Sequence, residues 1–330
     1  MLLCWLIGLR RPGAPFQIGS VGLQPAHTGE HAAADIILSR KDYPHRGLLR
    51  DRPPVHTFCH PTSQEQKMQI DLTGKTALVT GSTEGIGYAI VRQLARAGAD
   101  VVVNGRSEEK TAKAADRLKG EGAKGSVTAV AADLATAGGC DALVAQVPHV
   151  DILINNAGIF QPLDFFDADD EVWDRHWQVN VMSAVRLSRA YLPGMQKLDW
   201  GRVIFIASES GFNIPVEMIH YGVSKTADIA VARGLAKRMA GTGVTVNSVL
   251  PGPTLSEGVE AMLAEERAKT GKPIEEVAAD FVKKHRAGSI IQRAASVEEI
   301  ANLVTYLASP LASATTGASM RVDGGLIDTL

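Results

Sequence analysis

Three residues in the middle of the chain, Ser208, Tyr221 and Lys225, have the types and spacing needed to move a proton. Tyr221 and Lys225 are four residues apart, so on a helix they share one face and the ammonium can stand beside the phenol. Free tyrosine has a pKa of about 10, too high for proton exchange at neutral pH, and a fixed cation favours its ionised form. Ser208 lies 13 residues before Tyr221 and can hydrogen-bond a substrate oxygen. The spacing predicts acid–base chemistry, although a tyrosine and a lysine so placed also occur on ordinary helices.

A glycine-rich turn earlier in the chain has the features of a dinucleotide site. A short apolar run at 76–80 passes through three glycines into the helical pattern 86–94. Glycines let the backbone approach a pyrophosphate closely, and the start of the next helix offers unpaired N–H groups and a partial positive charge. Glycines at this spacing also describe a plain loop. The candidate contacts in this turn are Gly81, Ser82, Thr83, Gly85, Ile86 and Gly87.

The end of the second apolar run, 99–104, bears on which nucleotide is used. In dinucleotide folds an acidic residue here holds the ribose 2′-hydroxyl, whereas an arginine accommodates a 2′-phosphate. The chain offers Asn104, Arg106 and Ser107, with no carboxylate until Glu108. Because a guanidinium can bind a phosphate with two hydrogen bonds, the sequence predicts NADP in preference to NAD. A surface arginine without a ligand is the alternative for Arg106.

These motifs together identify a family. The form Thr-Gly-x-x-x-Gly-Ile-Gly at 80–87, the run Asn-Asn-Ala-Gly at 155–158 and the Ser, Tyr and Lys set resemble the short-chain dehydrogenase/reductase family, over 68–330. The resemblance implies that Tyr221 is the acid or base, that Lys225 lowers the phenol pKa and binds the ribose, and that Ser208 orients the substrate. It also implies that Asn180, in the context Gln-Val-Asn, holds a water that relays protons to the lysine. An exposed helical asparagine is the alternative for Asn180.

The resemblance also implies contacts with the nucleotide after later strands. Asp133 and Leu134 would lie near the adenine, although Asp133 as a helix cap needs no ligand. The turn at 156–158 would leave room for the nicotinamide ribose, and the turn at 251–254 would meet the carboxamide and the phosphates. Glu84 departs from NADP-specific relatives, which often have a basic residue there. These expected contacts are Asp133, Leu134, Asn156, Ala157, Gly158, Tyr221, Lys225, Pro251, Gly252 and Thr254.

The elements that must position these residues alternate along the chain. Apolar runs at 76–80, 99–104, 127–132, 151–154, 202–207, 244–250 and 319–322 predict strands, and helical patterns lie between them. This alternation predicts an α/β, three-layer Rossmann fold: a doubly wound parallel sheet of about seven strands with helices on both faces. No repeat or linker divides 68–330, so we expect a single catalytic domain there.

The substrate side is less specific. Residues 255–294 have two apolar helical stripes, separated by Gly271 and Pro273, that predict a helical lid or a hairpin that never moves. Phe160 and Phe212, with Ser208 and Tyr221, are predicted to bind the substrate. The wider set of pocket candidates is Phe160, Gln161, Glu209, Phe212, Ile214, Met218 and His220.

Composition limits the classes of function. The chain has 330 residues, 45% of them hydrophobic, and a formal net charge of -2, which gives no basic field for nucleic acid. Its three cysteines show no pairing pattern, so no metal site is expected and a reducing, cytoplasmic compartment fits. Met1–Leu9 is apolar but far shorter than the ~20 residues of a membrane span. Prolines recur through 1–67, which predicts a disordered extension, with Met68 as the hypothetical native start.

Three functions are compatible with these patterns. The first is an NADP(H)-dependent oxidoreductase that transfers a hydride between nicotinamide and a small-molecule carbonyl or secondary alcohol. The second is a 3-oxoacyl-carrier-protein reductase, whose acidic partner could meet the basic run 283–286. The third is a non-catalytic NADP-binding regulator, which would typically lack the tyrosine or the lysine. Trp173, Trp177 and Val181 form a stripe on a helix that, by the resemblance, lies in an oligomer face, so a homotetramer or homodimer is expected.

Overall fold

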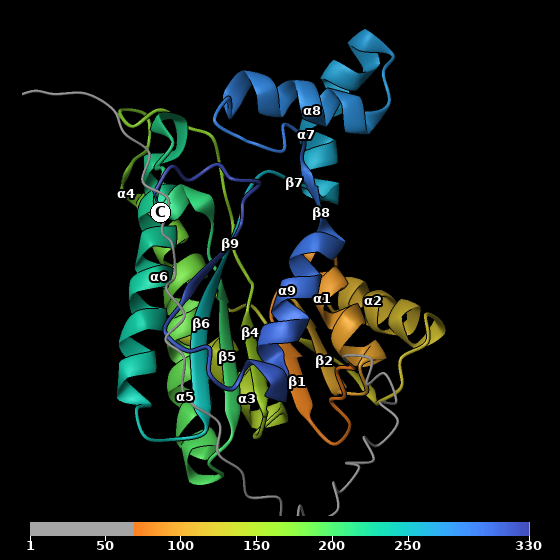
Figure 1. Cartoon of the computed structure of the whole chain (residues 1–330), viewed down its shortest axis with the longest axis vertical. Coiled ribbons are helices and arrows are strands. Elements are labelled where there is room, and N and C mark those ends of the chain that lie inside the picture. Colours follow the sequence, from red (N-terminus) through yellow and green to blue (C-terminus); the bar gives the residue numbers. More distant parts are fainter. Residues whose placement is uncertain (1–68, 330) are drawn as a thin grey trace, which may run out of the picture. The chain divides into compact units, whose positions relative to one another are not determined.

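The computed structural model describes residues 69–329 (Figure 1). The predicted extension at 1–67 and the hypothesis on Met68 lie outside these residues. One parallel sheet runs in the order β3-β2-β1-β4-β5-β6-β9, which confirms the predicted Rossmann fold. Its strands are β1 (Thr76–Val79), β2 (Asp100–Gly105), β3 (Val127–Ala131), β4 (Ile152–Asn155), β5 (Gly201–Ile206), β6 (Val244–Pro251) and β9 (Ser319–Val322).

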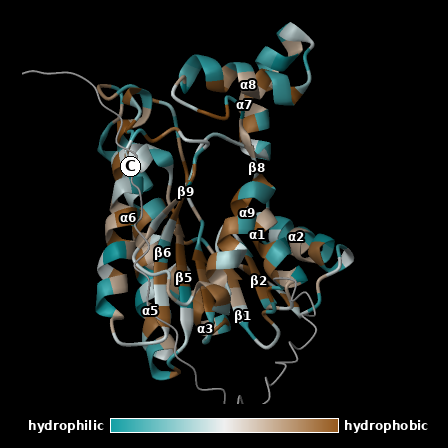
Figure 2. Cartoon of the chain, in the orientation of Figure 1, coloured by the Kyte–Doolittle hydropathy of each residue, from teal (hydrophilic) through white to brown (hydrophobic). Residues whose placement is uncertain are grey.

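Helices cover both faces of this sheet. On one face lie α1 (Gly85–Arg96), α2 (Glu108–Gly120) and α9 (Val297–Ala308), and on the other α3 (Ala137–Gln146), α5 (Ser183–Lys197) and α6 (Ile219–Arg238). Because side chains alternate along a strand, Ala77 and Val79 pack in the first layer and Leu78 in the second. Figure 2 shows apolar residues concentrated in the strands, with polar residues toward the outside of the helices.

Local capping residues set several helix starts. Ser107 accepts a hydrogen bond from the Lys110 N–H and caps the start of α2. At the start of α3 the cap is Thr136, whose hydroxyl accepts from the Gly139 N–H. Asp133 is therefore not the helix cap considered as an alternative; its carboxylate accepts from the Ala135 N–H in the preceding turn.

The helical stretch around Asn180 is not uniform. It consists of α4 (Asp170–His176), a π-helical segment η1 (Trp177–Met182) and then α5. A π turn inserts an extra residue into the helical ladder, and such insertions often occur at functional sites. Asn180 lies within the π turn, so its side chain leaves the helix in a direction that an unbroken helix would not give.

A small helical unit follows the sixth strand. The strands β7 (Thr254–Leu255) and β8 (Ala295–Ser296) pair with each other, and between them run α7 (Glu257–Thr270) and α8 (Ile274–His285). Gly271 ends α7 with a positive φ of 66°. Leu263 of α7 packs on Val277 and Ala278 of α8, so the two predicted apolar stripes face each other. Both helices lie beyond the carboxyl ends of the main strands, at the top of Figure 1.

The remaining short elements are η2 (Glu209–Gly211), η3 (Val216–Met218) and η4 (Pro310–Ala312). Within 69–329, every helix is too short or too polar to cross a lipid bilayer. The strand order reverses between β1 and β4, because β2 and β3 extend the sheet in one direction and β4, β5 and β6 in the other. In open sheets of this kind, ligands bind at the carboxyl ends of the strands beside such a reversal.

Candidate active site

A cavity of about 440 Å³ opens at the carboxyl ends of β4, β5 and β6. Helices α6, α7 and α8 and the start of α1 complete its wall. Residues predicted from separate motifs meet here. They are Ile86, Asn156, Gly158, Phe160, Ser208, Glu209, Met218, Tyr221, Lys225, Pro251, Gly252 and Thr254.

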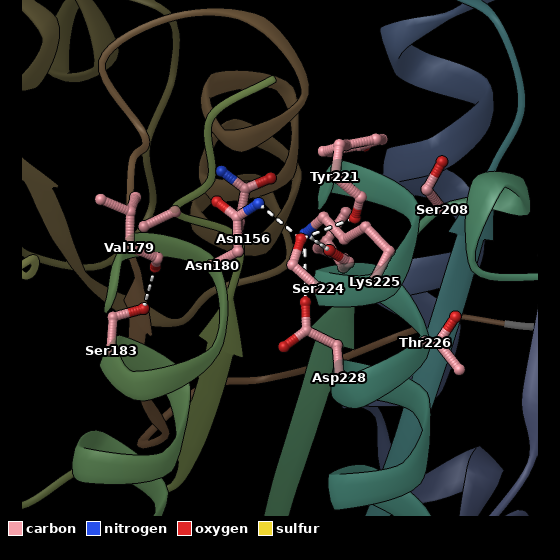
Figure 3. A network of polar contacts seen from close by, with 12 residues as sticks. Asn156, Val179, Asn180, Ser183, Ser208, Tyr221, Ser224, Lys225, Thr226 and Asp228 are labelled. Carbon is pink, nitrogen blue, oxygen red and sulfur yellow. Dashed lines mark hydrogen bonds and ion pairs between the residues drawn. The ribbon is translucent and has the colours of Figure 1, made fainter. Parts of the chain in front are cut away.

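Helix α6 carries the predicted acid–base pair. Lys225 is buried, and its Nζ donates to the Ile206 carbonyl at 2.9 Å and contacts Asp228 Oδ2 at 3.1 Å (Figure 3). Burial by itself lowers the pKa of Lys225, but the negative charges of Asp228 and Tyr221 outweigh it and leave the pKa above its ordinary value. Tyr221 borders the cavity, and its ring forms a T-shaped pair with that of Phe160. The ammonium is thus held in the cavity wall as a cation.

Asn180 is buried rather than exposed, which excludes the alternative of a surface asparagine. Its Oδ1 accepts from the Ile159 N–H at 2.8 Å, and its Nδ2 donates to the Ile159 carbonyl at 3.0 Å and to Ser224 Oγ at 2.9 Å. A Cβ on Gly158 would lie 3.5 Å from both Asn180 Oδ1 and Lys225 Nζ. Asn180 therefore joins the π turn to α6 and to the loop after β4, beside the ammonium; its role toward a water stays a prediction.

Ser208 follows β5 and is buried at the cavity wall. Its Oγ accepts from the Ser210 N–H at 3.1 Å, which leaves the hydroxyl proton to donate. The next residue, Glu209, is also buried, and its pKa is raised by that burial, against the opposing charge of Arg286. Arg286 follows α8, and its Nε lies 3.6 Å from Glu209 and its Nη1 3.1 Å from Glu217. One guanidinium thus joins the end of the helical unit to η2 and η3, the two short helices that follow the serine.

The glycine turn has the backbone that its sequence predicts. Gly81 and Gly85 have positive φ angles of 60° and 59°, a conformation that favours glycine. The Gly85 N–H, at the start of α1, donates to a carboxylate oxygen of Glu257 at 2.8 Å. An anionic oxygen therefore already binds this helix start, so the turn fits a dinucleotide phosphate, for which Glu257 would have to give way.

Some of the residues predicted to contact the nucleotide form hydrogen bonds that hold the glycine turn in place. Ser82 and Asn104 are fully buried, and the Asn104 N–H donates to Ser82 Oγ at 3.0 Å. The Asn156 amide donates to the Thr80 and Gly81 carbonyls, which ties the end of β4 to the turn. A separate hollow of about 400 Å³ beside the turn is lined by Thr83, Glu84, Arg106, Ser107 and Lys110. Lys110 is a second cation next to Arg106 that we did not predict.

The structure does not bring every predicted residue to the main cavity. Phe212, Ile214, Gln161 and His220 are absent from its lining. Phe212 is half exposed, and His220 is buried on another side of α6, with its ring 4.4 Å from that of His176. These residues were candidates because they are close in the sequence to a strand end or to Tyr221. Closeness in the sequence does not determine the direction in which a side chain points. Asp133 and Leu134 likewise lie outside both hollows, with Leu134 packed in the core.

Residues that we did not place in the pocket come mainly from the helical unit. The sequence showed the apolar periodicity of these two helices, but it did not show which residues face the site. They are Val259, Met262, Leu263, Ala278, Phe281, Val282, His285 and Arg286. Within 69–329, no group of His, Cys, Asp and Glu residues could hold a metal ion.

Comparisons with known proteins point to one family. A family model for short chain dehydrogenases matches residues 75–267. The chain is 50% identical over 260 residues to uncharacterized oxidoreductase YvaG of Bacillus subtilis (strain 168), covering 79% of this chain and 98% of that protein. It is 33% identical over 262 residues to 3-oxoacyl-(acyl-carrier-protein) reductase FabG of Aquifex aeolicus (strain VF5), covering 78% and 100%. Among solved structures, L-sorbose reductase from Gluconobacter frateurii complexed with NADPH and L-sorbose is similar, with a TM-score of 0.75, 33% identity and coverage of 80% and 100%.

Proposed function

The chain belongs to the short-chain dehydrogenase/reductase family, and we propose that it is an NADP(H)-dependent oxidoreductase acting on a carbonyl or secondary alcohol. The observation that carries this proposal is the convergence of Ser208, Tyr221 and a buried, charged Lys225 on one cavity beside the glycine turn. The structural neighbour described as complexed with NADPH and L-sorbose supports it. When bound, the nicotinamide supplies or accepts the hydride.

The residues of the chain would handle the proton and the substrate oxygen. The Tyr221 hydroxyl would donate a proton to a carbonyl oxygen during reduction, or accept one from an alcohol during oxidation. Lys225 would favour the phenolate through its charge, and Ser208 would hold the same oxygen by a hydrogen bond. Asn180 would hold a water that relays protons to Lys225. Phe160 and the apolar faces of α7 and α8 would exclude bulk water, which strengthens these electrostatic effects.

Replacing Tyr221 by phenylalanine removes the proposed proton donor and little else. We expect kcat/KM for carbonyl reduction to fall about 10²–10⁴-fold, with a much smaller change in NADPH affinity, because Tyr221 is one of many expected nucleotide contacts. The measurement is NADPH oxidation across a panel of ketones, aldehydes and acyl thioesters, with binding followed by fluorescence. The matched control is Tyr306→Phe on α9, outside the cavity.

The same panel separates the alternatives. Turnover confined to acyl thioesters would favour the 3-oxoacyl-carrier-protein reductase, which the similarity to FabG supports. Cofactor binding without turnover of any compound would favour the non-catalytic regulator.

The preference for NADP rests on the hollow beside the glycine turn. Arg106 and Lys110 both border it, and a 2′-phosphate placed there would meet two cations against the single carboxylate of Glu84. Glu84 is the residue that opposes this assignment.

Arg106→Asp should reverse the cofactor preference. A hydrogen bond to a charged group contributes about 1.5–3 kcal/mol, so the KM for NADPH should rise roughly 10- to 100-fold while that for NADH falls. Steady-state kinetics with both cofactors measure this, and Lys113→Asp, on α2 but outside the hollow, is the control. Unchanged KM values in the Arg106 variant would refute the assignment.

We also propose that the unit at 255–294 acts as a lid over the substrate within a single catalytic domain at 68–330. Its support is the ion pair between Arg286 and the buried Glu209, which joins the end of α8 to the residue after Ser208. The apolar faces of α7 and α8 form one wall of the cavity.

Arg286→Ala leaves the buried Glu209 without its partner, which costs about 1–3 kcal/mol. The KM for the carbonyl substrate should rise about tenfold at constant NADPH affinity, whereas Lys269→Ala, which breaks an exposed ion pair on α7, should change neither. A substrate KM that stays at the wild-type value would show that the helical unit does not hold the substrate.

We propose a cytoplasmic homodimer or homotetramer. Trp177 on η1 is 43% exposed and borders a hollow of mixed polarity with Trp173 of α4 and Val223 of α6, whereas Val181, the third residue of the predicted stripe, is buried. Sedimentation of the protein as a monomer at micromolar concentration would contradict the oligomer.

A further inference from the structure

We propose that Asp228 is a positioning residue: its carboxylate is the counterion that keeps Lys225 protonated inside the site. This inference rests on the proposed function, since it concerns the charge that acts on Tyr221. Nothing in the sequence motifs pointed to Asp228, which lies three residues after Lys225 on α6.

The geometry is that of a closed, buried ion pair. Lys225 Nζ lies 3.1 Å from Asp228 Oδ2, and the two side chains are 6% and 4% exposed. The other partner of the ammonium is the Ile206 carbonyl, a neutral acceptor, at 2.9 Å. Figure 3 shows Asp228 one helical turn below Lys225, with its carboxylate directed up toward the ammonium.

The ammonium needs a negative partner to keep its proton. Burial without one lowers the pKa of a lysine by up to 3–5 units, which would leave it largely neutral at the pH of the reaction. Among the residues described, Asp228 and Tyr221 are the titratable groups whose charges act on Lys225. Tyr221 cannot be the permanent partner, because its ionisation is what the lysine must promote. Asp228 is the group that remains.

The titratable groups on elements packed against α6 at this level are engaged elsewhere. Glu209 of η2 pairs with Arg286. His176 of α4 packs against His220, and its Nδ1 bonds to the Val172 carbonyl. Among the described residues, Lys225 is the single charged group that acts on the Asp228 carboxylate.

A buried carboxylate at position 228 lowers the stability of the fold if it has only a structural role. Its second oxygen, Oδ1, is buried without a hydrogen-bond partner in the part of the chain described here. Burial raises the pKa of Asp228, and Lys225 opposes that rise. An apolar side chain would fill a buried helix position without this penalty. The charge of Asp228 is therefore explained by what it does to Lys225.

The test compares Asp228→Asn, which keeps shape and an acceptor but removes the charge, with Asp228→Glu, which keeps the charge. The pKa of Lys225 should fall in the Asn variant. For alcohol oxidation, in which Tyr221 acts as the ionised base, the alkaline limb of kcat/KM should therefore move at least about one pH unit lower, a roughly tenfold loss above it. The Glu variant should restore the limb. Asp100→Asn, a hydrogen-bonded carboxylate on β2 outside the cavity, is the control.

A second measurement needs no substrate. Phenolate absorbance is titrated in the unliganded protein, and the Tyr221→Phe variant identifies the signal of Tyr221. Tyr221 should ionise at higher pH in Asp228→Asn than in the wild type. This titration still tests Asp228 if no carbonyl compound is turned over, which separates failure of this inference from failure of the proposed function.

An unchanged pH profile and phenolate titration in Asp228→Asn would overturn the proposal. A shift of the acid limb to lower pH would also overturn it, because the lysine would then hold its charge unaided and act more strongly on the phenol. Should the Asn variant not fold by circular dichroism, Asp228→Val, which leaves no unpaired polar group, takes its place in both measurements.

Discussion

A buried ammonium is the constraint on which the site depends. Lys225 has left water, so each of its partners must come from the protein: a carbonyl at the end of β5 and a carboxylate one turn further along α6. This requirement fixes α6 against the sheet and so places Tyr221 at the cavity. A charge held in such surroundings acts more strongly on a neighbouring phenol than the same charge in water. The contacts that hold α6 against the sheet are therefore the same contacts that place the Lys225 charge beside Tyr221.

The rest of the fold brings other groups to the same point. Parallel strands end together, so the glycine turn after β1, the amide of Asn156 after β4 and Ser208 after β5 meet at one edge of the sheet. The π turn then directs Asn180 between the β4 loop and α6. Helices α7 and α8 form the wall of the cavity that faces the sheet edge. Arg286, at the end of α8, joins this helical unit to Glu209 by an ion pair.

Much of this was predictable, because the signals are local. Apolar runs predicted the seven strands and their order of appearance, and the glycine turn predicted the start of α1. Contacts between distant or internally facing side chains were not predictable. An aspartate at position 228 suggests a solvated helix face until its burial is known. His220 adjoins Tyr221, but successive residues of a helix point about 100° apart, so it faces His176 rather than the cavity. The Glu257 carboxylate on the Gly85 N–H joins segments 172 residues apart.

The most direct test is the charge of Lys225 in the unliganded wild-type protein. Nuclear magnetic resonance of isotope-labelled lysine, with the Lys225 signal assigned by its loss in Lys225→Met, reports whether the side chain is protonated. The account predicts an ammonium at neutral pH that keeps its proton to a higher pH than the exposed lysines. A neutral amine at neutral pH would contradict it.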